Sequence, residues 1–133
     1  MENYKPVNEL VEQIMRRFRE AWDDLVDTIK VDRVTREEKN ELNKLKEEEY
    51  NKLLVIYEEQ KLPPKALAQI LARVENSKTN AEKLAIFYKY TFYNSKGTRE
   101  ENNKESFEIA EDFTNKILSN EDKKSFKEAM NKL

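Results

Sequence analysis

Residues 8–30 read NELVEQIMRRFREAWDDLVDTIK, and their apolar side chains recur at steps of three and four. This spacing places them on one side of an α-helix, so the stretch predicts a long amphipathic helix over residues 8–30. Trp22 continues the stripe from Phe18 to Leu25, and we expect its indole to be buried. The stripe consists of Leu10, Val11, Ile14, Met15, Phe18, Trp22, Leu25, Val26 and Ile29.

Four later segments begin with a helix-capping pattern, in which a threonine or serine precedes an acidic residue by three positions. The patterns start at Thr35, Thr79, Thr98 and Ser119. The apolar spacing that follows each one predicts a helix, and these helices cover residues 36–61, 80–93, 99–118 and 120–132. Pro63 and Pro64 open a further short helix, because the missing N–H of proline costs nothing in the first turn. Gly97 is expected to end the helix over residues 80–93 in a left-handed conformation.

The composition favours one helical domain over residues 1–133. The chain contains one glycine and three prolines, whereas sheet proteins need many turn residues. Charged residues make up 39% and hydrophobic residues 38%, which suits amphipathic helices with solvated outer faces. We therefore expect an all-α fold, a compact bundle of about six largely antiparallel helices with short connections. No apolar run has the length of a membrane span or a secretory signal, so we expect a cytoplasmic protein.

The residue types present exclude several chemistries. Without histidine and cysteine, the chain lacks the commonest general base, the thiol nucleophile and the ligands of most zinc sites. We predict no enzymatic activity, no cofactor and no metal. The acidic run over residues 47–49 is expected to form a solvated helix face. The arginines of the first two helices and of the segment between them are expected to form ordinary ion pairs on exposed faces. They are Arg16, Arg17, Arg19, Arg33 and Arg36.

The helix over residues 80–93 is apolar on two sides. One side, with Leu84 and Tyr88, continues the expected core. The opposite side predicts a partner-binding patch, because tyrosines bordered by charges are typical of protein interfaces. The residues of this patch are Ile86, Lys89, Tyr90 and Tyr93. The alternative is that the helices over residues 99–118 and 120–132 cover this side, which would place the helix at the centre of the bundle.

Residues 34–97 resemble the immunity proteins that protect bacteria from their own class II bacteriocins. The resemblance rests on VTREEKNELN at residues 34–43, on LPPK at 62–65, and on FYKY at 87–90 before NSK at 94–96. It implies an antiparallel four-helix bundle that binds the complex of bacteriocin and membrane receptor. This chain departs from that pattern by its long first helix and by two further helices.

Together, these observations predict a non-catalytic helical interaction protein that binds a protein partner. A small bacterial or phage antagonist, or an immunity-type factor, fits the size and the missing chemistry. The alternative is a helical nucleic-acid-binding protein or a small subunit of a nucleoprotein complex, although the net charge of −2 does not favour it. The sequence is also compatible with a homo-oligomer, in which copies of this chain bind one another.

Overall fold

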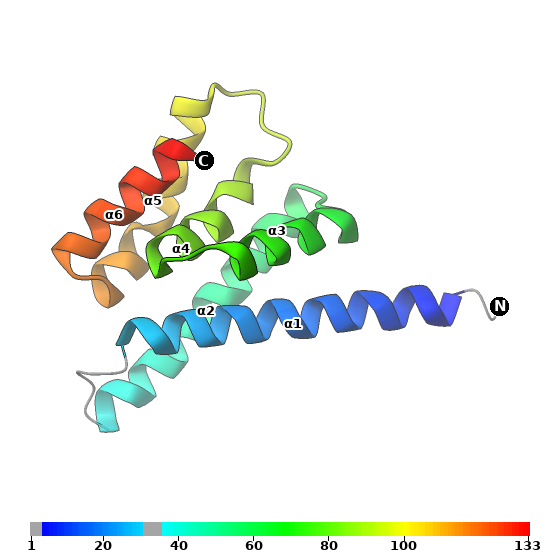
Figure 1. Ribbon diagram of the computed structural model, residues 1–133, viewed down its shortest axis with the longest axis horizontal. Coiled ribbons are helices and arrows are strands. Elements are labelled where there is room, and N and C mark those ends of the chain that lie inside the picture. The colour runs from blue at the N-terminus through cyan, green and yellow to red at the C-terminus, as the bar shows by residue number, and fades with distance from the viewer. Residues whose placement is uncertain (1–3, 31–35) are drawn as a thin grey trace.

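The computed structural model describes residues 4–30 and 36–133, and nearly all of them are helical. Figure 1 shows that the helices pack into a bundle, and no strand occurs in the described ranges. The predicted all-α class is therefore confirmed. The elements are α1 (Tyr4–Lys30), α2 (Arg36–Glu59), α3 (Pro64–Asn76), α4 (Asn80–Lys89), the 3-10 turn η1 (Tyr90–Phe92), α5 (Arg99–Ile117) and α6 (Asn120–Lys132).

The predicted helix caps set the starts of α4, α5 and α6. In each, the side-chain oxygen of the capping residue accepts a hydrogen bond of 3.2 Å from the backbone N–H three residues later. The capping residues are Thr79, Thr98 and Ser119. Such a bond satisfies one of the donors that a helix start leaves unpaired. The fourth predicted cap, at Thr35, lies outside the described residues.

Among the described residues, the left-handed residue is Lys61 and not Gly97. Lys61 has a φ of 55°, whereas Gly97 does not have a positive φ. The N–H of Lys61 donates to Glu58 at 3.0 Å, and that of Leu62 donates to Tyr57 at 3.1 Å. These two bonds form the Schellman motif that ends α2. A Cβ at Gly97 would lie 2.7 Å from the side-chain oxygen of Asn102, so that side chain would have to shift.

The substitution Lys61→Gly is expected to stabilise the protein by roughly 0.5–1 kcal/mol. A left-handed conformation strains a residue that carries a Cβ, and glycine removes this strain at some cost in unfolded-state entropy. Urea denaturation of the wild type, Lys61→Gly and Lys61→Ala would measure the effect. Alanine keeps the Cβ and serves as the control, so equal stability of the two variants would contradict the prediction.

The core of the bundle surrounds α4. This helix packs against α1, α3, α5 and α6, and it lies between α3 and the α5–α6 hairpin (Figure 1). Its residues 84–88 are all buried. Most of the buried apolar side chains form one cluster with members from all six α-helices. The central position of α4 thus explains why this helix is apolar on both sides.

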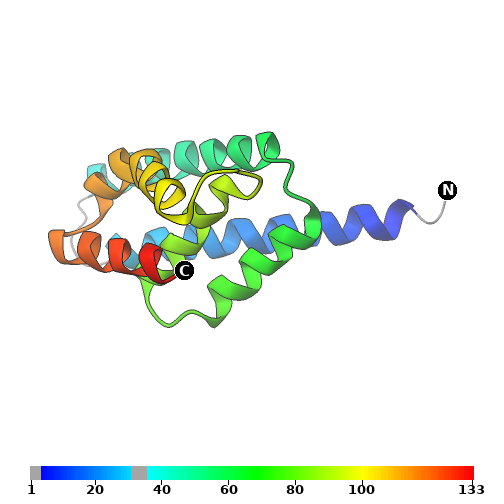
Figure 2. The ribbon, with the colours of Figure 1, turned by 90° about the horizontal axis from the view of Figure 1, so that it is seen from above.

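The apolar stripe of α1 divides into a buried half and a largely uncovered half. Trp22 is completely buried, as predicted, with its ring centroid 5.1 Å from that of Phe87 and 5.4 Å from that of Phe113. Its indole N–H donates to the carbonyl oxygen of Lys46 at 3.0 Å. The amino-terminal part of α1, in contrast, extends beyond the other helices (Figure 2), and Leu10 is 56% exposed.

Candidate functional site

The structure separates the four residues of the predicted partner-binding patch. Ile86 is only 3% exposed and belongs to the core, so it is not part of an exposed patch. The reason is that α4 is covered on both sides by its neighbours. Lys89 and Tyr90 are half-buried, whereas Tyr93 is 47% exposed. The helical periodicity also ends early, because Tyr90 begins a 3-10 turn with a larger rotation per residue.

Lys89, Tyr90 and Tyr93 line one surface hollow of about 470 Å³. Two further cations line it with them, Arg73 from the last turn of α3 and Arg99 from the first turn of α5. We call it the basic hollow, and the lining residues that matter here are Arg73, Lys89, Tyr90, Tyr93, Arg99 and Asn103. It combines three cations with two tyrosines, which is a chemistry suited to an anionic ligand.

Main-chain carbonyls at the end of α6 hold part of this hollow in place. Arg99 donates to the carbonyl of Asn131 at 2.9 Å, and Asn103 donates to that of Met130 at 3.0 Å. Lys89 donates to a main-chain oxygen of Leu133, which also lines the hollow. The last carbonyls of a helix lack intrahelical partners and carry partial negative charge, so cations are favoured there.

The burial and the positive charges of the hollow affect the pKa of Lys89. Partial burial lowers the pKa of its ammonium group, and the nearby charges of Arg73 and Arg99 lower it further. Within the described residues, none of these three cations forms an ion pair with an aspartate or glutamate side chain. The guanidinium of Arg73 instead lies over the ring of Tyr90, 6.0 Å from its centroid. The hollow therefore carries positive charge that no aspartate or glutamate of the described residues pairs.

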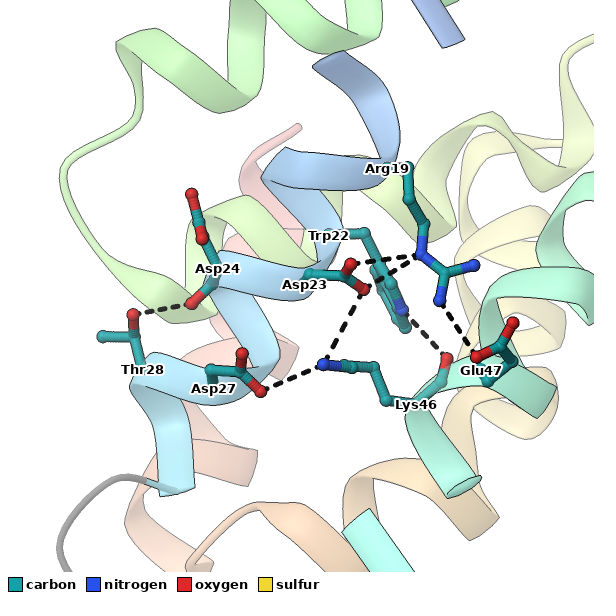
Figure 3. Close-up of polar contacts among 8 residues, drawn as sticks. All are labelled: Arg19, Trp22, Asp23, Asp24, Asp27, Thr28, Lys46 and Glu47. Carbon is teal, nitrogen blue, oxygen red and sulfur yellow. Dashed lines mark hydrogen bonds and ion pairs between the residues drawn. The ribbon is translucent and has the colours of Figure 1, made fainter. Parts of the chain in front are cut away.

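The cations at the interface of α1 and α2 are different, because they are paired with acids. Figure 3 shows Arg19 between Asp23, at 3.0 Å, and Glu47, at 3.3 Å. Lys46 lies 3.2 Å from Asp27 and 3.9 Å from Asp23. This network surrounds the indole N–H of Trp22 and joins the two helices. It leaves little net charge for a ligand.

The arginines that the sequence marked as candidates for surface ion pairs differ in whether they have an acidic partner. Arg19 pairs with Asp23 as predicted, and Arg17 lies 2.6 Å from Glu75 of α3. Arg16 is exposed. Arg33 lies outside the described residues. These observations agree with ordinary surface ion pairing for the two arginines that have partners.

The acidic run over residues 47–49 does not form a uniformly solvated face. Glu47 and Glu48 are exposed, but Glu49 is only 7% exposed and faces Tyr88 of α4. The Tyr88 hydroxyl donates to the Glu49 carboxylate at 2.5 Å, and Lys52 lies 3.7 Å from the same oxygen. Burial raises the pKa of Glu49, although the bond from Tyr88 and the charge of Lys52 oppose this shift. We interpret this pair as a polar contact that orients α2 against α4.

Sequence reasoning identified part of the basic hollow and missed Arg73 and Arg99. Both cations come from other helices, so no local spacing links them to Lys89 or Tyr93. One signal was present, because Arg99 occupies the first turn of a helix, where a positive charge opposes the helix dipole. A residue in such an unfavourable place is explained by a contact elsewhere, here with α6.

Comparisons of this chain with protein-family models, curated proteins and solved structures found no match in any of the three. None of the described helices combines the length and the apolar character that a membrane crossing requires. In the same part of the chain, no three acidic side chains converge as metal ligands would.

Proposed function

We propose that this chain is a non-catalytic interaction protein that binds a protein partner through the basic hollow. The observation that carries the proposal is Tyr93, which is 47% exposed beside three cations without aspartate or glutamate partners. Large exposed hydrophobic side chains are few in the described residues, and the other two are Leu10 and Val55. Tyrosine supplies a large contact area with a polar end, and such residues are common at the energetic centres of interfaces.

The matched variants Tyr93→Ala and Val55→Ala test this proposal. Both truncate an exposed side chain, so their melting temperatures are expected to stay within about 2 °C of the wild type. Tyr93→Ala is expected to weaken partner binding by roughly 30-fold, the effect of an interface residue worth about 2 kcal/mol. Val55→Ala is expected to bind normally, because Val55 lies on α2, outside the hollow.

The measurement is capture from native cells with tagged wild type, followed by titration of the captured protein against each variant. Equal binding by Tyr93→Ala and the wild type would contradict the proposal. Tyr90→Ala is less informative, because Tyr90 is half-buried and packs against the core, so its loss would also lower stability.

The finer form of the proposal is an antagonist or immunity-type role in the bacterial cytoplasm. It is supported by the resemblance of residues 34–97 to bacteriocin immunity proteins and by the lack of histidine and cysteine. Expression of the chain in a bacteriocin-sensitive strain would test it by survival under bacteriocin, with Tyr93→Ala as the inactive control.

Nucleic-acid binding is the second candidate, and the cluster of three cations beside tyrosines is the observation in its favour. Direct titration of a labelled oligothymidylate separates the two functions. A nucleic-acid-binding protein would bind the oligonucleotide with an affinity that falls steeply as salt rises, because contacts to phosphates release counterions, whereas the proposed protein-binding hollow is expected to bind the captured partner more tightly than the oligonucleotide.

A further inference from the structure

We propose that the basic hollow recognises an acidic segment of the partner protein, with glutamate or aspartate carboxylates bound between Arg73, Lys89 and Arg99. This inference rests on the proposed function and specifies the chemistry of the partner. It predicts that affinity depends on the charges of the hollow as well as on Tyr93.

The first argument is unused hydrogen-bonding capacity. A guanidinium group has five N–H donors and an ammonium group has three, and neither can accept. Arg99 makes one hydrogen bond to a carbonyl, through one terminal nitrogen, and Lys89 makes one to Leu133. Their remaining donors belong to side chains that line the hollow. Carboxylates match this need, since each oxygen accepts from more than one donor and arginine binds them in a two-bond geometry.

The second argument is that the cations are held in place before a ligand binds. Main-chain oxygens at and just after the end of α6 accept from Arg99 and Lys89, and the ring of Tyr90 lies beneath Arg73. Side chains that are already ordered lose less entropy on binding, so more of the interaction energy appears as affinity. Lys89 is also partly desolvated, which strengthens its attraction to an incoming carboxylate.

The third argument is the size of the basic surface. The three cations line one hollow of about 470 Å³, which has room for a few side chains. A nucleic-acid duplex needs a long positive surface that follows its phosphates, and this chain carries a net charge of −2. The tyrosines add apolar area for the methylene groups of glutamate. An acidic peptide segment therefore fits better than a nucleic acid.

The test uses the full chain and a fluorescein-labelled poly-glutamate peptide, with binding followed by anisotropy. The double variant Arg73→Glu with Arg99→Glu is expected to weaken binding at least tenfold. The matched control is Arg16→Glu with Lys65→Glu, which changes the net charge equally at two exposed cations outside the hollow and is expected to keep most of the affinity. Equal losses in the two double variants would overturn the proposal.

A second measurement does not depend on a folded variant. Titrating the unlabelled peptide into isotope-labelled wild type is expected to shift the amide resonances of Lys89, Tyr93 and Arg99 most strongly. Shifts concentrated elsewhere would overturn the proposal, as would tighter binding of a labelled oligothymidylate. If the captured partner loses affinity for Tyr93→Ala but not for the charge-reversed variant, the proposed function stands and only this inference fails.

Discussion

Replacing Trp22 with alanine is expected to lower the free energy of unfolding by about 3–5 kcal/mol. The side chain is completely buried and contacts aromatic rings from three other helices, those of Tyr50, Phe87 and Phe113. Its removal leaves a cavity next to the α1–α2 charge network and also removes the hydrogen bond to Lys46. Because the free energy of unfolding of a small domain is only about 5–15 kcal/mol, this single change would remove a large part of it.

Trp22→Phe is the graded control for this prediction. It keeps an aromatic ring in the core but loses the indole N–H and part of the volume, so a smaller loss of about 1–3 kcal/mol is expected. Urea denaturation followed by far-ultraviolet circular dichroism would measure both variants without relying on tryptophan fluorescence. A loss below roughly 1 kcal/mol for Trp22→Ala would mean that the indole is not buried in solution.

Replacing Tyr88 with phenylalanine is expected to lower the free energy of unfolding by about 2–3 kcal/mol at neutral pH. The variant keeps the ring but leaves the buried Glu49 carboxylate without the hydroxyl that donates to it at 2.5 Å. Hydrogen bonds to charged groups contribute about 1.5–3 kcal/mol, and an unpaired buried charge is costly. Burial also raises the pKa of Tyr88 well above 10, so its hydroxyl stays protonated and can donate at neutral pH.

This loss should grow as the pH rises. The folded-state pKa of Glu49 is raised above its ordinary value of 4.5, chiefly by burial. The stability that this group contributes is therefore fully present below the unfolded pKa and is lost as the pH rises through the folded pKa. Without Tyr88 as a donor, the pKa of Glu49 rises further, so Tyr88→Phe should lose more stability than the wild type between acid and neutral pH.

Urea titrations over this range, repeated with Glu49→Gln in both backgrounds, complete a double-mutant cycle. Glutamine does not ionise, so in its presence the cost of Tyr88→Phe should be smaller and independent of pH. A cost of Tyr88→Phe that stays constant from acid to neutral pH, or that is unchanged beside Glu49→Gln, would show that the two side chains do not interact as described.

The sequence by itself determined the helical segments, because the forces that start and stop helices act over a few residues. Thr79, Thr98 and Ser119 each cap a helix through a bond to a group three positions away. Apolar spacing placed Trp22 in the core for the same reason, since a helix face is set by local geometry. Gly97 shows the limit of such rules, because the left-handed residue proved to be Lys61 at the end of α2.

Only the tertiary structure decided which polar and apolar side chains remain accessible. Ile86 and Tyr93 are alike in the sequence pattern, yet the neighbours of α4 bury the first and leave the second 47% exposed. Glu49 stands in an acidic run like its neighbours, but the approach of α4 encloses it against Tyr88. Arg73, Lys89 and Arg99 come from three helices and meet because α3, α4 and α5 converge near the end of α6. Burial and the gathering of charges depend on long-range packing, which local spacing does not encode.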